Sequence, residues 1–64
     1  MFLIDCILDY DATKVRVGAK FKVTNPLLKK FEYVIVIEVN VKYIYKSLCV
    51  PYNDKLYKKL NKGV

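Results

Sequence analysis

The chain has 64 residues, 12 Lys and Arg against 6 Asp and Glu, and no His, so its net charge is +6. A chain this short holds a single domain, residues 1–64, and a hydrophobic content of 55% excludes a disordered chain. Without His it lacks the commonest general acid or base, so we expect a binding protein and no enzyme.

The N-terminal segment predicts a short strand over residues 2–8. Phe2, Ile4, Cys6 and Leu8 alternate with other residues, which places them on one face of a strand. Residues 9–13 contain two aspartates and predict a turn, because Asp side chains accept hydrogen bonds from nearby backbone N–H groups.

A second strand is predicted over residues 14–24, with one apolar and one basic face. The apolar face contains Val15, Val17, Ala19, Phe21 and Val23. The basic face contains Lys14, Arg16, Lys20 and Lys22. Gly18 within this pattern indicates a bulge or a sharp bend.

The segment Asn25-Pro26 ends that strand, because proline has no N–H for a strand ladder, and residues 27–30 predict a loop. The strongest strand signal covers residues 31–39, where the middle is apolar on both faces. Such a strand is expected at the centre of a sheet, covered on both sides. Asn40 predicts a tight turn after it, since Asn tolerates positive φ.

The C-terminal part predicts a strand over residues 42–50 and then a short helix. Pro51 ends the strand, and Asn53 or Asp54 is expected to cap a helix that runs to about Lys62 with Gly63 as its C-terminal cap. Together these elements predict a mainly β fold. We expect a small antiparallel sheet or an SH3-like barrel of about four to five strands, with one short C-terminal helix.

Residues 15–23 (VRVGAKFKV) resemble the V-x-V-G-x-x-h-x-V opening strand of small SH3-like and KOW-type β-barrels, where h is a hydrophobic residue. Residues 33–48 (YVIVIEVNVKYIYKSL) are similar to the central hairpin of these barrels, although Ala19 stands where an acidic residue usually follows the glycine. The resemblance implies binding of nucleic acid or of protein surfaces, and no catalysis.

Metal and cofactor sites are not expected. Cys6 and Cys49 are the only cysteines, no C-x-x-C spacing occurs, and no His can complete a zinc site. Two reduced cysteines fit the composition, and one disulfide would form if the two ends of the chain met. No secretory signal or membrane span is apparent, so a cytoplasmic protein without a membrane partner is expected.

Nucleic acid, or a nucleic-acid-processing complex, is the first expected partner. Lysines on two strand faces would track phosphates, and Tyr43 and Tyr45 would offer a stacking platform for bases. The alternative for the tyrosines is a place in the core or at its rim. The expected nucleic-acid-binding residues are Lys14, Arg16, Lys20, Lys22, Lys42, Tyr43, Tyr45 and Lys46.

A protein partner is the competing hypothesis. Leu27 and Leu28 lie in a loop where apolar side chains are hard to bury, and Lys29 and Lys30 adjoin them, which is typical of a contact site. In the alternative without a protein partner, the two leucines fold back over the open end of the barrel. A small protein without catalytic residues also fits an inhibitor of the phage or mobile-element type, which blocks a host enzyme by occupying its surface. The small core also allows a homodimer.

Overall fold

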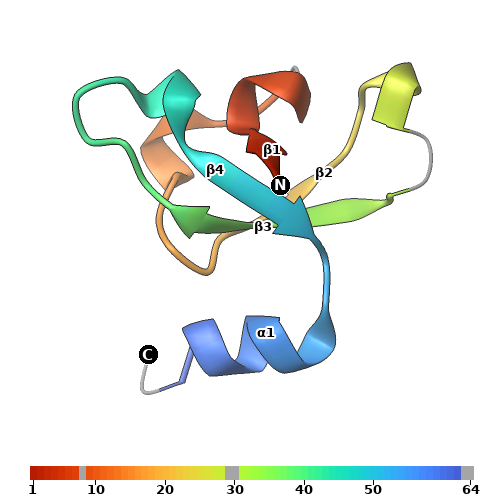
Figure 1. Ribbon diagram of the computed structural model, residues 1–64, viewed down its shortest axis with the longest axis vertical. Coiled ribbons are helices and arrows are strands. Elements are labelled where there is room, and N and C mark those ends of the chain that lie inside the picture. Colours follow the sequence, from red (N-terminus) through yellow and green to blue (C-terminus); the bar gives the residue numbers. More distant parts are fainter. Residues whose placement is uncertain (8, 29–30, 63–64) are drawn as a thin grey trace.

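The computed structural model describes residues 1–7, 9–28 and 31–62 (Figure 1). An antiparallel sheet and a terminal α-helix are linked through several 3₁₀ turns. The elements are β1 (Phe2–Leu3), η1 (Ile4–Ile7), η2 (Ala12–Lys14), β2 (Lys20–Lys22), η3 (Pro26–Leu28), β3 (Tyr33–Glu38), η4 (Ile44–Lys46), β4 (Leu48–Pro51) and α1 (Asp54–Leu60).

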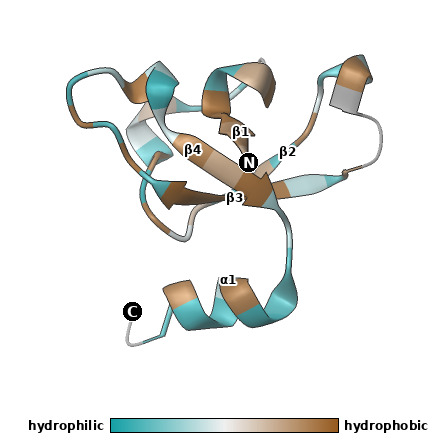
Figure 2. Ribbon diagram, viewed as in Figure 1, coloured by the Kyte–Doolittle hydropathy of each residue, from teal (hydrophilic) through white to brown (hydrophobic). Residues whose placement is uncertain are grey.

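The central strand is β3, as the apolar run predicts. It lies between β4 and β2 in the order β1-β4-β3-β2, and every pairing is antiparallel. Val34, Ile35 and Val36 are fully buried, so both faces of the strand are covered. Figure 2 shows the hydrophobic residues concentrated on β3, β4 and β1.

The predicted strand over residues 2–8 is wrong beyond Leu3. A two-residue β1 is followed by η1, in which Ile4 and Ile7 are buried while Cys6 is exposed. Burial at a spacing of three residues is the 3₁₀ period, and it replaces the period-two alternation of a strand. Leu8 lies outside the described residues.

The predicted strand over residues 14–24 is reduced to β2, only three residues long. Lys14 ends η2, and the Ala19 N–H donates to the Arg16 carbonyl at 3.0 Å, which closes a turn just before β2. Gly18 has φ +91° in this turn, so the predicted bend is confirmed. Val17 is 43% exposed, because the turn takes it out of the predicted apolar face.

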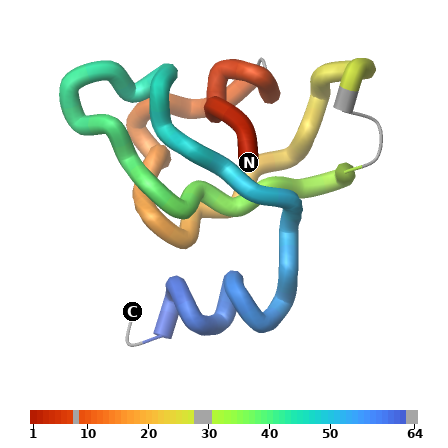
Figure 3. Tube along the Cα trace, in the orientation of Figure 1, coloured from red at the N-terminus to blue at the C-terminus, as the bar shows by residue number. Residues whose placement is uncertain are grey.

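The predicted tight turn at Asn40 and the strand over 42–50 are also wrong in extent. A wide connection that contains η4 joins β3 to β4 (Figure 3). β4 begins only at Leu48, which faces Glu38 after a register irregularity between Val36 and Glu38. Asn40 stabilises this connection through its side chain, because its Oδ1 accepts the Tyr43 N–H at 2.9 Å.

The C-terminal helix forms as predicted. The Asn53 side chain accepts the Leu56 N–H at 3.1 Å and so caps α1. Leu56, Tyr57 and Leu60 are half-buried, and the helix lysines are exposed. α1 ends at Leu60 with Asn61 as the C-cap, whereas the predicted cap Gly63 lies outside the described residues.

The sheet is open, so of the two predicted architectures the sheet with one helix is the one observed. β1 and β2 are its two edges and do not pair in the described part of the chain. Side chains nevertheless bridge the segments beside these edges. Thr24 Oγ1 donates to the Ile7 carbonyl, and Asn25 Nδ2 to the Cys6 carbonyl, each at 2.7 Å. These two bonds replace the ladder that would close a barrel.

Candidate functional site

The connection formed by residues 40–47, called the 40–47 loop below, is held at its base by one buried hydroxyl. Ser47 is 1% exposed, and its Oγ accepts the Asn40 N–H at 3.1 Å. Its carbonyl accepts the Ile4 N–H at 2.8 Å, which ties the loop to η1. The short 3₁₀ turn closes with the Lys46 N–H donating to the Tyr43 carbonyl at 2.8 Å. The loop therefore has a defined conformation without a strand ladder.

This loop presents two tyrosine rings to solvent. Tyr43 is 40% exposed and Tyr45 46% exposed. Their ring centroids lie 5.8 Å apart and the planes differ by 55°. The two rings lie side by side, but on the η4 turn and not on the predicted strand over 42–50, and neither ring belongs to the buried core. A planar base can stack on one ring or on the other, because tilted rings do not form one flat surface.

Two lysine ammonium groups accompany these rings. The Nζ atoms of Lys42 and Lys46 lie 5.4 and 4.9 Å from the centroid of the Tyr43 ring. Such cation–π contacts stabilise an exposed site by about 0.5–1 kcal/mol each. Four of the eight residues expected to bind nucleic acid thus form one cluster: Lys42, Tyr43, Tyr45 and Lys46.

Three other residues of the expected set surround a second feature, called the basic pocket below. It has a volume of about 480 Å³ and lies where η2, β2 and α1 meet. Its lining residues are Thr13, Lys14, Arg16, Ala19, Lys20, Phe21 and Tyr57. None of these lining residues is acidic.

Hydrogen bonds of Asn61 join the Gly18 turn to the end of α1 and so shape this pocket. Asn61 Nδ2 donates to the Gly18 carbonyl at 3.1 Å and to the Tyr57 carbonyl at 2.8 Å. Arg16 Nη1 donates to Asn61 Oδ1 at 3.4 Å and to the Val17 carbonyl at 3.3 Å. Figure 3 shows the turn before β2 above the C-terminal end of α1. The guanidinium is thus held beside the helix.

Lys20 and Lys22 lie on the edge strand β2 and differ in their surroundings. The Lys20 ammonium lies 4.3 Å from the centroid of the Tyr33 ring and 4.5 Å from that of Tyr52.

Lys22 lies outside the basic pocket and faces Tyr33 at the beginning of β3. The 40–47 loop instead adjoins the other end of β3. Since a strand rises about 3.3 Å per residue, roughly 17 Å of β3 separates the two positions. The predicted basic residues therefore do not form one continuous surface.

The leucine site predicted for protein binding is described only in part. Leu27 is 91% exposed, so this side chain is not folded back over the sheet. The Asn25 side chain accepts the Leu27 N–H at 2.9 Å and fixes the start of η3. The Leu28 side chain, Lys29 and Lys30 lie outside the described residues.

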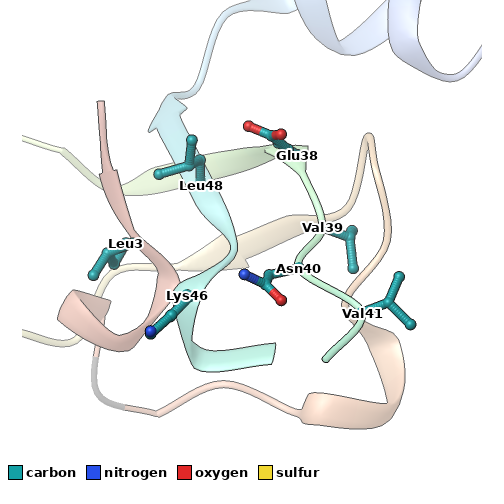
Figure 4. Close-up of a pocket in the computed structure, with 7 residues that line it drawn as sticks. All are labelled: Leu3, Glu38, Val39, Asn40, Val41, Lys46 and Leu48. Atoms are coloured by element: carbon teal, nitrogen blue, oxygen red, sulfur yellow. The ribbon is translucent and has the colours of Figure 1, made fainter. Parts of the chain in front are cut away.

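An apolar pocket of about 600 Å³ lies between β1 and the 40–47 loop (Figure 4). It is lined by Leu3, Glu38, Val39, Asn40, Val41, Lys46 and Leu48. One carboxylate and one ammonium balance each other at its walls, so the pocket does not favour an anion. Val41, one of the lining residues, is 88% exposed.

The described residues offer little for covalent or metal chemistry. No group of three or more His, Cys, Asp or Glu that could hold a metal ion occurs in the part of the chain that the structure describes. Burial raises the pKa of the Cys49 thiol to about 11, and the nearby Cys6 adds to this shift, so Cys49 stays protonated at neutral pH. A protonated, buried thiol is a poor nucleophile. Both cysteines are free.

The sequence reasoning did not assign Tyr57 and Asn61 to a site. In the sequence Tyr57 falls between Leu56 and Leu60 on the apolar side of the predicted helix, and Asn61 has no neighbour that marks its role. Their contribution to the basic pocket depends on where the helix end docks. No sequence signal near Asn61 could have shown that contact.

Comparison with known proteins adds no family to this description. No family model, no curated protein and no solved structure matches the chain. No helix in the described ranges has the length and apolar character needed to cross a membrane.

Proposed function

We propose that this protein is a non-enzymatic module that binds single-stranded nucleic acid through the 40–47 loop. The observation that carries the proposal is the exposed pair Tyr43 and Tyr45 with the ammonium groups of Lys42 and Lys46 beside it. Exposed aromatic rings next to lysines are the usual elements of a site that stacks bases and contacts phosphates.

The free energy of base stacking on Tyr43 is comparable to, or larger than, that of the lysine–ring contacts that a base would displace. A base that stacks on the Tyr43 ring gains about 1–3 kcal/mol, whereas each lysine–ring contact that it displaces is worth about 0.5–1 kcal/mol. A displaced ammonium then remains beside the bound nucleic acid, where it can contact a phosphate. Lysine carries its charge as a point, so little sequence specificity is expected.

Fluorescence anisotropy with a labelled oligothymidylate tests the proposal. Tyr43→Ala with Tyr45→Ala should weaken binding by about 5- to 150-fold for each ring on which a base stacks, because both rings are removed. Tyr43→Phe with Tyr45→Phe keeps the rings and should bind like the natural chain. Two phosphate contacts should weaken binding about sevenfold between roughly 50 and 200 mM salt.

Charge-matched variants separate the loop from the net charge. Lys42→Gln with Lys46→Gln should reduce the salt dependence, whereas Lys55→Gln with Lys58→Gln removes the same charge from exposed helix positions and should have a smaller effect. Equal losses in the two pairs, or full binding by the double alanine variant, would overturn the proposal. Absence of any binding at low salt would leave the protein-binding hypothesis, with the exposed Leu27 as its contact.

A further inference from the structure

The basic pocket concentrates positive charge from separate parts of the chain. Lys14 comes from η2, Arg16 from the turn before β2, and Lys20 from β2 itself. No acidic side chain is among the lining residues, and an aromatic ring, Tyr57, forms the wall on the helix side. The Lys20 ammonium lies over the Tyr33 and Tyr52 rings, which do not line the pocket. We therefore expect an anion in the pocket to contact Lys14 and Arg16 first. A concave site with cationic groups and one ring favours an anion that is attached to a planar group.

The arginine of this pocket is positioned before any ligand binds. Asn61 is fixed by its bonds to the Gly18 and Tyr57 carbonyls, and its Oδ1 accepts the Arg16 Nη1–H group. These bonds occupy donors of Nη1 only, which leaves Nε and Nη2 for an incoming oxyanion. A guanidinium held in this way loses less side-chain entropy on binding than a mobile lysine.

The Asp11 carboxylate lies beside the pocket without lining it, next to the lining residues Thr13 and Lys14. Asp11 accepts two bonds on Oδ1, from the Thr13 N–H at 3.0 Å and from the Thr13 hydroxyl at 2.6 Å. These bonds, with a smaller contribution from Lys14, lower the pKa of Asp11, so it is ionised at neutral pH. Asp54 lies beside Tyr52, whose ring is 5.6 Å from that of the lining residue Tyr57. These two carboxylates against three cationic side chains still leave an excess of positive charge at the pocket.

We infer that the basic pocket is a phosphate-binding site that takes a nucleotide phosphate, with the base against Tyr57. Two sources share this chemistry, a free mononucleotide and a phosphate of a nucleic-acid strand. A volume of about 480 Å³ lies within the usual range for small-ligand sites. The inference does not depend on base stacking at the 40–47 loop.

Two-dimensional NMR of the full chain tests this site with uridine monophosphate, inorganic phosphate and uridine as probes. The monophosphate should cause saturable shifts at the Lys14 and Ala19 amides and at the Arg16 side chain, with millimolar affinity. Inorganic phosphate should shift the same signals more weakly, and uridine should not shift them. No saturable shift at these positions up to about 20 mM, or equal shifts with uridine, would overturn the inference.

Variants assign the effect to the pocket. Arg16→Gln and Lys14→Gln should each weaken binding of the monophosphate by up to about fivefold, the range of one partly exposed ion pair. Lys58→Gln removes the same charge from an exposed helix position and should change the affinity little. Unchanged signals outside the pocket show that each variant is folded. An equal loss in Lys58→Gln would overturn the assignment.

The two sources and the two sites can be told apart. An oligothymidylate with a 5′-phosphate should shift the pocket signals if a strand supplies the phosphate, and only the mononucleotide should do so otherwise. Tyr43→Ala with Tyr45→Ala should leave the mononucleotide shifts intact even if it abolishes oligonucleotide binding. Loss of these shifts in that variant would refute an independent pocket and leave the proposed function unaffected.

Discussion

At the scale of single residues, the Gly18 turn shows how one backbone conformation positions a distant side chain. Gly18 has φ +91°, a region that side chains with a Cβ rarely adopt. A Cβ at this position would lie 3.1 Å from Asn61 Nδ2 and 3.3 Å from the Leu60 Cβ. The missing side chain thus allows both the turn and the close approach of the helix end, and the basic pocket depends on both.

Gly18→Ala should lower the free energy of unfolding by about 1–2 kcal/mol, the usual cost of a left-handed conformation for a residue with a Cβ. Urea denaturation measures this change. In an Asn61→Ala background the cost should be smaller, because the contact with Asn61 is gone while the backbone strain remains. An alanine variant as stable as the natural chain would contradict this account of the turn.

At the scale of elements, the 40–47 loop replaces a predicted tight hairpin. Its conformation depends on the buried Ser47 hydroxyl, which accepts the Asn40 N–H across the base of the loop. The only serine of the chain therefore has a structural role. The exposed tyrosines occupy the middle of a segment whose two ends are fixed.

Ser47→Ala should destabilise the fold by about 1–2 kcal/mol, because the Asn40 N–H loses its partner in a partly buried position. It should also speed hydrogen exchange at the Asn40 amide. Thr13→Ala is the matched control, since its hydroxyl bonds an exposed carboxylate and surface substitutions cost less than about 0.5 kcal/mol. Equal costs for the two variants would contradict a special role of Ser47.

At the scale of the whole molecule, side-chain bonds join the segments beside the two edges of an open sheet. Thr24 and Asn25, which follow β2, donate to carbonyls of η1, which follows β1. The buried residues Ile4, Ile7, Val34, Val36 and Cys49 form one core cluster with Ala19. The junction formed by the Thr24 and Asn25 bonds therefore closes the core of a very small domain. In such a domain each bond is a large part of the net stability.

Thr24→Val with Asn25→Ala should lower the free energy of unfolding by about 3 kcal/mol, roughly 1 kcal/mol for each of the bonds lost. Two of these bonds join the sheet edges, and the third is the bond from the Leu27 N–H to the Asn25 side chain. For a domain of this size that loss corresponds to a fall in Tm of about 12–24 °C. Thr24→Ser alone keeps the hydroxyl and should stay near the natural stability. Unchanged exchange of the Ile4 amide in the double variant would show that the junction does not hold the N-terminal segment.

The sequence was sufficient for features that depend on neighbouring residues. The double-sided apolar run around Ile35 determined a central strand, the Asn53 cap determined the start of the helix, and Gly18 determined a bend. Each of these properties is set within a few positions of the chain. The pairing of Tyr43 and Tyr45 did not follow in this way, because it was expected on a strand and is instead made by the η4 turn.

The strand lengths were overestimated, because alternation alone does not distinguish a strand from an extended segment that ends in a 3₁₀ turn. Ile4 and Ile7 adopt the period of three because η1 packs on the core. Residues 42–47 leave the strand because Ser47 holds Asn40. Both outcomes depend on contacts between residues that do not follow one another in the sequence.

Length and composition by themselves determined a small basic chain without His. Only the tertiary structure decided how the positive charge is divided. It groups Lys42 and Lys46 with the exposed tyrosines, and Lys14, Arg16 and Lys20 around a pocket completed by Tyr57. The physical reason is that charge is a property of the composition, whereas a site needs groups from separate elements at one place, and the docking of α1 on the Gly18 turn provides that.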